Sequence, residues 1–212
     1  PQKRQRVFII SIRNDVMEDI GMPWMLASSI YPEPRIEEEP TIEDAIGDLR
    51  NDEENMAEAR VLCEIMKKGA KYKWLKRLPK NPEKVVSVGD DVVSPWYDKV
   101  IRHRAKWGKE IPEHKNSFFQ SRRVPWHQAS HTLSEQGLQT SLAVHLHASE
   151  DRVFTTKESK RLMTLPEDYI LTRTLNQQLA RIGLMVAPMC MKYVADSIYE
   201  NILKPYKEKK GE

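Results

Sequence analysis

Few residues in this chain can supply thiol or thiol–metal chemistry. Its 212 residues include two cysteines, Cys63 and Cys190, and no Cys-x-x-Cys spacing. This scarcity excludes a disulfide framework and favours reduced thiols in a cytoplasmic setting. The six histidines include the alternating pair His145 and His147, but no cysteine supports them, so we predict no metal site.

Long apolar runs are also absent. No run approaches the roughly 18 residues that a transmembrane helix needs, and Val7–Ile10 is far too short for a signal peptide. Hydrophobic residues make up 40% and charged residues 31% of the chain, which predicts a soluble, folded protein of one or two small domains. Because the chain begins at Pro1, directly before a strand-like run, we expect it to be part of something longer.

The small net charge of +3 conceals a strong asymmetry. Residues 14–66 contain 15 acidic and 3 basic residues, a net charge of −12, whereas residues 67–127 contain 16 basic and 6 acidic residues, a net charge of +10. A basic segment of this length fits a surface that contacts phosphate groups. It fits a solvated face that balances the acidic half equally well, so charge alone leaves both interpretations open.

The first structural element predicted is a strand. Val7–Ile12 is apolar on both faces, which is typical of a strand buried inside a layered α/β sheet. Residues 13–15 are expected to end it. A proline-rich loop is predicted next, because the residue before a proline is disfavoured in a helix. Its prolines are Pro23, Pro32, Pro34 and Pro40.

Capping and periodicity predict two helices in the acidic half. Thr41 and Asp44 have the spacing of a capping box. The apolar face of the helix that follows consists of Ile42, Ala45, Ile46 and Leu49. A second amphipathic helix is predicted over residues 53–68, with Met56, Ala59, Cys63 and Met66 directed inward.

The basic half has a different character. Between residues 70 and 127, short apolar pieces at 84–88 and 91–93 alternate with turn-forming residues. Four tryptophans also fall in this stretch: Trp74, Trp96, Trp107 and Trp126. The pattern predicts a small irregular unit of short strands and loops.

Regular structure is predicted again after residue 128. A short strand is expected at residues 131–133. Thr155 and Glu158 form a second capping box, which opens a helix to about Leu165 before Pro166 ends it.

The last predicted helix begins near Asn176, is interrupted near Gly183 and Pro188, and continues to about Leu203. Its apolar stripe consists of Cys190, Met191, Val194, Ala195, Ile198 and Ile202. The charged tail from Lys204 is expected to be frayed.

The first residues carry a motif. Pro1-Gln2-Lys3-Arg4-Gln5-Arg6-Val7 resembles the Pro-Gln-x-Arg-x-Arg-hydrophobic block of the DNA cytosine-C5 methyltransferases. Two arginines at i and i+2 that enter a strand point the same way, and a planar guanidinium can donate to a base carbonyl, a phosphate or a carboxylate. The resemblance implies that Arg6 reaches the carbonyl side of a flipped cytosine, while Gln2 and Arg4 brace the loop.

A longer and more specific block lies between Arg152 and Tyr169. With Arg152 as the leading arginine, the run 154–169 resembles the family pattern Arg-x-Leu/Phe-Thr-x-x-Glu-x-x-Arg-Leu-x-x-Phe/Leu-Pro-Asp-Asp-Phe/Tyr. Upstream, residues 130–133, Ser-His-Thr-Leu, resemble the family element Ser-Pro-Thr-Leu/Ile.

A third block covers residues 178–188, Gln-Leu-Ala-Arg-Ile-Gly-Leu-Met-Val-Ala-Pro, and resembles Gln-x-x-Arg-x-Ile-Gly-Asn-Ala-Val-Pro-Pro. In the family this segment forms one wall of the S-adenosylmethionine pocket. The resemblance therefore implies a cofactor-binding role for Gly183, Leu184, Met185 and Val186. Leu184 lacks the polar side chain of the family's asparagine, and alanine replaces the first proline, whereas the backbone and shape of the wall are expected to remain.

Together these blocks imply an α/β fold: the C-terminal part of a Rossmann-like methyltransferase sheet, with a small irregular α+β DNA-recognition domain inserted. The implied boundaries are an end strand of the catalytic domain at 1–19, a target-recognition domain at 20–127, and a C-terminal segment at 128–212 whose helices return to the catalytic domain. Duplex DNA is the implied partner. Arg122 and Arg123, which close the recognition region, are the best candidates to contact it.

The groups that perform C5 methylation are missing. The reaction needs a thiolate that adds to cytosine C6, a carboxylic acid at N3, a methyl donor and a flipped base. The family carries these functions on a Pro-Cys loop, a Glu-Asn-Val segment and a Gly-rich loop. The chain contains no Pro-Cys, no Glu-Asn-Val and no Gly-x-Gly sequence, and its two cysteines are predicted to be small core residues.

This chain alone is therefore not expected to methylate DNA. It fits part of a DNA (cytosine-5-)-methyltransferase whose N-terminal catalytic half lies in the same long chain or in a separate subunit. The changed residues at 184, 185 and 187 motivate an alternative, a stand-alone DNA-binding or regulatory protein descended from such an enzyme. A third possibility is a soluble α/β interaction module with no role on DNA.

Overall fold

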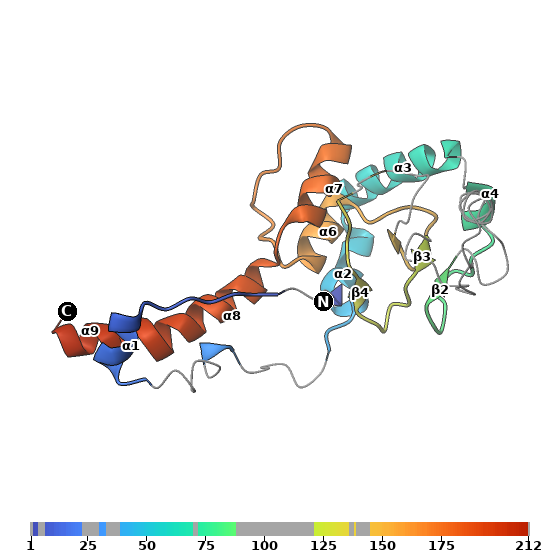
Figure 1. The fold of residues 1–212 in the computed structure, drawn as a ribbon. Helices are drawn as coiled ribbons and strands as arrows, with labels where there is room; N and C mark the ends of the chain where they lie inside the picture. Colours follow the sequence, from blue (N-terminus) through green and yellow to red (C-terminus); the bar gives the residue numbers. More distant parts are fainter. Residues whose placement is uncertain are drawn as a thin grey trace, which may run out of the picture. The chain divides into compact units, whose positions relative to one another are not determined.

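The computed structural model describes residues 2–3, 7–22, 30–32, 39–69, 72–87, 121–135, 138 and 145–211 (Figure 1). They form a mixed α/β structure that divides into two compact units. The first unit comprises residues 1–3 and 39–185, and the second comprises residues 4–38 and 186–212. Since this division cuts the chain differently from the three predicted domains, each unit is described by itself.

The first unit contains five described α-helices. They are α2 (Ile42–Ile46), which continues as a 3-10 turn over Gly47–Asn51, α3 (Glu53–Lys68), α4 (Tyr72–Leu75), α6 (Thr156–Leu162) and α7 (Leu175–Leu184). Of these, α2, α3, α6 and α7 each begin after a residue whose side chain caps the helix. The capping boxes predicted at Thr41 and Thr155 are both present. Thr174 forms a third box with Gln177 at the start of α7. Each box satisfies backbone amides that a helix leaves unpaired.

Helix α3 has the predicted bounds but a different buried face. Its buried side chains are Asn55, Ala59, Leu62 and Met66. Met56 and Cys63, which were predicted to point inward, are half-buried. The helix is therefore rotated slightly from the predicted orientation, and a polar residue begins its inner stripe.

The strands of the first unit are two residues long. They are β1 (Gln2–Lys3), β2 (Val86–Ser87), β3 (Arg122–Arg123), β4 (Ser130–His131) and β5 (His145–Leu146). β1 pairs with β4 in parallel, while β3 lies between antiparallel β2 and parallel β5. The strand predicted at residues 131–133 is thus present one residue earlier.

The first unit has two hydrophobic clusters. One contains Leu62, Met66, Leu75, Leu146, Val153 and Leu179. The other contains Ile42, Ile46, Leu49, Val124, Phe154 and Leu162. Val153 and Phe154 are neighbours in sequence yet belong to different clusters, as expected for an extended segment whose successive side chains point to opposite sides.

The second unit is built from helices. It contains α1 (Asn14–Ile20), α8 (Pro188–Ile198), a π-helical turn over Tyr199–Leu203 and α9 (Lys204–Lys210). α1 lies where a loop was predicted. The prediction of a frayed tail was wrong, because Gly211 caps α9 in the left-handed conformation and Lys210 Nζ lies 2.9 Å from Asp19 of α1.

The buried strand predicted at Val7–Ile12 was also wrong. Residues 7–13 belong to no strand, and Val7 and Ile9 are 89% and 88% exposed. A strand needs a neighbour to hydrogen-bond its backbone, and within the described part of the chain no strand pairs with this segment. These apolar side chains thus remain uncovered.

Some predictions concern residues outside the described ranges, so they stay predictions. They include Arg4, Arg6, Trp96, Trp107 and the piece at 91–93. Among the helices that are described, none is long and apolar enough to cross a lipid bilayer.

The close approach of α7 to the segment after β4 depends on Gly183. A Cβ atom at this position would collide with the carbonyl of Ser134 and the amide of Glu135.

We expect Gly183→Ala to lower the free energy of unfolding by about 1–3 kcal/mol, the usual cost of overpacking, measured by urea denaturation. In the control Gly47→Ala, the new methyl meets the flexible Glu43 side chain. An equal loss in both variants would contradict the packing role of Gly183.

Candidate functional site

Segments far apart in sequence that carry the family resemblance meet in the first unit. Gln2 lies opposite Ser130 in the parallel β1–β4 pair, which joins the first block to the Ser-His-Thr-Leu element. Gly183 of the third block packs against Ser134, just after that element. A glycine allows the two backbones to approach this closely. The blocks therefore form one framework.

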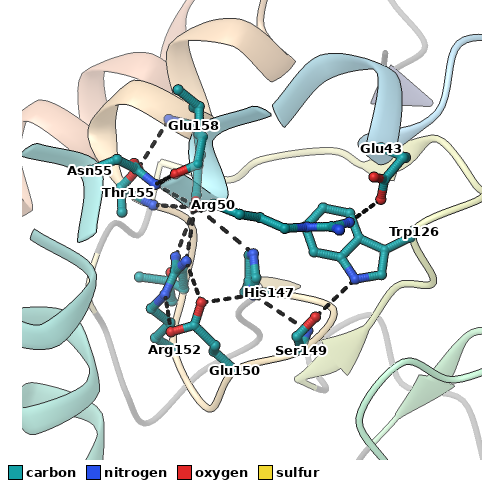
Figure 2. A network of polar contacts seen from close by, with 12 residues as sticks. Glu43, Arg50, Asn55, Trp126, His147, Ser149, Glu150, Arg152, Thr155 and Glu158 are labelled. Carbon is teal, nitrogen blue, oxygen red and sulfur yellow. Dashed lines mark hydrogen bonds and ion pairs between the residues drawn. The ribbon is translucent and has the colours of Figure 1, made fainter. Parts of the chain in front are cut away.

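A buried ion pair lies at the centre of the second block (Figure 2). Arg152 Nη1 and Nη2 donate to the two carboxylate oxygens of Glu158 at 2.7 and 2.9 Å. Arg152 also binds Glu150 at 3.0 and 3.2 Å. Arg152 and Glu158 are 1% and 2% exposed, and a bidentate pair is the geometry in which a buried guanidinium and carboxylate compensate each other best.

The remaining acceptor capacity of Glu158 is filled from α3 and from the cap of α6. Asn55 Nδ2 donates to Glu158 Oε1 at 3.1 Å and to the carbonyl of Leu49 at 3.2 Å. The backbone amide of Thr155 donates to Glu158 Oε2 at 2.9 Å, and its hydroxyl donates to Asn55 Oδ1 at 2.5 Å. The capping box, the ion pair and helix α3 are thus connected through one carboxylate (Figure 2).

Further polar contacts join α3 to α6 around this centre. The amide and hydroxyl of Thr156 donate to the Glu58 carboxylate at 2.7 and 2.6 Å. Lys157 Nζ lies 2.7 Å from Asp52, the residue that caps α3. With the buried contacts of Asn55, they fix α3 against the start of α6.

Two charges of this network hold each other ionised. Burial by itself raises the pKa of Glu158, but the hydrogen bonds and charge of Arg152 outweigh it and the pKa falls below its usual range. Burial likewise opposes the charge of Arg152, yet Glu158 and Glu150 raise its pKa. The pair is therefore charged at neutral pH.

The neighbouring histidines are neutral. Burial, assisted by the charge of Arg152, lowers the pKa of His147 to about 4. Burial and His131 lower the pKa of His145 to about 4 as well. The His147 ring packs edge-on against Trp126 and Phe154, with centroids 5.0 and 6.0 Å apart. In the described ranges no three His, Cys, Asp or Glu side chains are grouped to hold a metal ion.

Arg123 requires a correction. It is 0% exposed and donates to the carbonyls of His147 and Glu150 at 2.5 and 2.6 Å and to Asp151 Oδ1 at 2.6 Å. Its guanidinium holds the turn that precedes Arg152, so this placement does not support the predicted DNA contact. Arg122 is half-buried, and neighbouring residues of a strand point to opposite faces.

The other predicted site residues occupy varied positions. The backbone of Gln2 forms β1, whereas its side chain, Arg4 and Arg6 lie outside the description. Leu184 ends α7 with 62% of its surface exposed, and Val186 is 37% exposed. Gly183, which precedes Leu184 in α7, is buried.

Sequence reasoning missed Asn55 and the role of Glu150 and His147. Asn55 could have been found, because it occupies position i of an i, i+4, i+7, i+11 stripe whose other members are apolar and buried. A polar residue at such a position needs a buried partner. Nothing local indicates that the partner is Glu158, since 103 residues separate the two.

The sequence of this chain is similar to those of known proteins. The sequence profile described as C-5 cytosine-specific DNA methylase matches residues 1–200. The chain belongs to this family. The family resemblance predicted from the short blocks is thereby confirmed.

A curated relative is similar over a shorter stretch. It is "Putative type II methyltransferase M.OihORF3336P" of Oceanobacillus iheyensis, which is 33% identical to this chain over 73 residues. The aligned stretch covers 34% of this chain and 16% of that methyltransferase. The chain therefore matches a small part of its relative.

The buried ion pair generates a double-mutant test. We expect Arg152→Met to lower the free energy of unfolding by about 3–5 kcal/mol, because it leaves the Glu158 charge buried without its partner. Arg152→Met combined with Glu158→Leu should lose less than the single variant. Urea denaturation of the wild type and the variants measures both effects, and a double variant less stable than Arg152→Met would refute the explanation.

The neutral histidines predict a pH dependence. With a pKa of about 4 in the fold and 6.5 when unfolded, His147 binds more protons in the unfolded chain between these values. The free energy of unfolding should therefore fall as pH falls through this window, by about 1.4 kcal/mol per pH unit for one histidine. His147→Gln should remove this part of the slope, measured by urea denaturation from pH 7 to 5. His127, which is exposed, provides the control His127→Gln; a slope unchanged by His147→Gln would contradict the assignment.

Proposed function

We propose that this chain supplies the target-recognition and C-terminal segments of a DNA cytosine-5-methyltransferase. In this role it binds duplex DNA and helps to position a flipped cytosine, while an N-terminal catalytic half carries the thiolate and the acid, in the same chain or in a separate subunit. One observation carries the proposal: the family profile spans residues 1–200, yet the chain contains no Pro-Cys, Glu-Asn-Val or Gly-x-Gly sequence.

Uncovered apolar side chains support a requirement for another protein surface. On the second unit, Val7 and Ile9 are almost fully exposed, and Met191 and Leu203 are each about half-exposed. On the first unit, Leu184 is exposed at the end of α7. Exposed apolar side chains of this size are found on surfaces that another protein covers.

The base-side residues are assigned by resemblance. Arg6 is proposed to reach the carbonyl side of the flipped cytosine, with Gln2 and Arg4 as braces. The parallel pairing of Gln2 with Ser130 supports this role, because it fixes the start of the block to the framework. Arg122 remains a proposed DNA contact.

S-adenosylmethionine is the proposed cofactor and would supply the methyl group when bound. Leu184, Met185 and Val186 are the proposed apolar contacts to the cofactor, and Gly183 brings the end of α7 close to Ser134. Because the side chain of Leu184 cannot replace the hydrogen bonds of an asparagine, this chain would contact the cofactor through shape and backbone.

One observation favours a second function, a stand-alone DNA-binding or regulatory protein derived from such an enzyme. Residues 184, 185 and 187 depart from the family pattern. If these changes have removed cofactor binding, DNA binding would persist without methyl transfer.

A mixing experiment separates the two. The chain is combined with an N-terminal half that carries a Pro-Cys loop, a Glu-Asn-Val segment and a Gly-rich loop, together with labelled S-adenosylmethionine and duplex DNA. We expect labelled DNA only when both halves are present. DNA binding without methyl transfer at any ratio of the halves would support the regulatory protein instead.

A matched pair of variants tests the base-side assignment in the same assay. Arg6→Ala should reduce methyl transfer on the order of 100-fold, as loss of a donor to a reacting base does. Arg13→Ala serves as the control, because Arg13 is exposed and pairs with exposed Asp15 at 2.5 Å. Equal rates for the two variants would argue against a role for Arg6.

A further inference from the structure

We propose that the basic segment, defined as residues 73–84 after the start of α4, contacts the phosphate backbone of duplex DNA. This inference rests on the proposed function and specifies the surface that it uses. The segment replaces Arg123 as the main electrostatic contact, since that arginine is buried.

The basic segment presents its positive charges to solvent. It carries one acidic residue, Glu83, against five exposed basic residues. These are Lys73, Lys76, Arg77, Lys80 and Lys84. The net charge of this segment is therefore +4, which arises from side chains that a DNA strand could reach.

The backbone beneath these charges is anchored. Leu75 is buried in the first hydrophobic cluster and Leu78 packs against it. The amide of Asn81 donates to the carbonyl of Ala148 at 2.9 Å, and its Oδ1 accepts from Trp126 Nε1 at 3.1 Å and from Ser149 Oγ at 2.7 Å. Binding would order lysine side chains on a backbone that is already fixed, which lowers its entropic cost.

The nearest turn cannot neutralise the segment. Asn81 lies against residues 148–149, and the two carboxylates that follow are already paired inside the fold. Glu150 binds Arg152 at 3.0 Å, and Asp151 binds Arg123 at 2.6 Å. The buried arginines thus use the acidic groups of this turn.

Strand pairing extends the basic surface. Ser87 of β2 lies opposite Arg122 of β3, so Arg122 lies next to the strand into which the basic segment runs. The acidic charge of the unit lies elsewhere in its sequence, where residues 42–64 contain eight acidic and two basic residues. Repulsion from phosphates would keep that part away from DNA.

Lysines act on phosphate as point charges and carry no sequence information. The segment is therefore expected to provide affinity without selecting bases. Each lysine–phosphate contact should add about 0.9 to the slope of log affinity against log salt.

The test compares two triple variants of the full chain. Lys76→Ala/Lys80→Ala/Lys84→Ala removes three charges from the basic segment, and Lys192→Ala/Lys204→Ala/Lys207→Ala removes three exposed charges from the second unit. Fluorescence anisotropy with a labelled duplex of mixed sequence gives the affinity at several salt concentrations. We expect the first variant to reduce the magnitude of the salt slope by about 3, and the second to leave it near the wild-type value.

Two results would overturn the inference. The first is an equal change in salt slope for both variants, which would mean that net charge alone governs binding. The second is competition by polyglutamate that is as strong as competition by unlabelled duplex. Either result leaves the proposed function intact if the wild type still supports methyl transfer on mixing. Wild-type protein that neither binds duplex nor supports transfer would instead reject the proposed function itself. Circular dichroism checks that both variants are folded.

Discussion

The rest of the first unit depends on keeping the Glu158 carboxylate charged inside the protein. A buried carboxylate without a partner is costly, and here Arg152, Asn55 and the amide of Thr155 all donate to it. Because these donors come from three different segments, one requirement fixes the start of α6, the N-terminal turn of α3 and the extended residues before α6. The two hydrophobic clusters, one containing Val153 and the other Phe154, are built on that arrangement.

The described basic residues of the first unit include two contrasting groups. Arg123 and Arg152 are buried and serve the fold, since a guanidinium can satisfy several carbonyls and carboxylates at once. Lys76, Lys80 and Lys84 of the basic segment are instead exposed, and they are proposed to contact phosphate groups.

Much of the framework could be predicted from the sequence, and the exceptions have physical causes. Capping boxes and periodicity are local, so the starts of α2, α3 and α6 were predicted correctly. The burial of Val7–Ile12 and of Arg123 depends on which distant segments pack against them. No local sequence pattern specifies those contacts. Arg152 and Glu158 both occur in a motif that the sequence contains. The hydrogen bond from Asn55 to Glu158 could not be predicted, because the two residues are far apart in the sequence.

The contact between Asn55 and Glu158 closes a loop of the chain, because 103 residues separate them. The free-energy cost of closing a loop grows slowly, by about 0.6 kcal/mol for each doubling of its length. Once α3 and α6 are joined, insertions and deletions in the part between them therefore change stability little, provided that the anchoring residues are kept. The contact between Asn55 and Glu158 would therefore allow the intervening sequence to diverge in length and composition over evolution, while the packing of α3 against α6 stays the same.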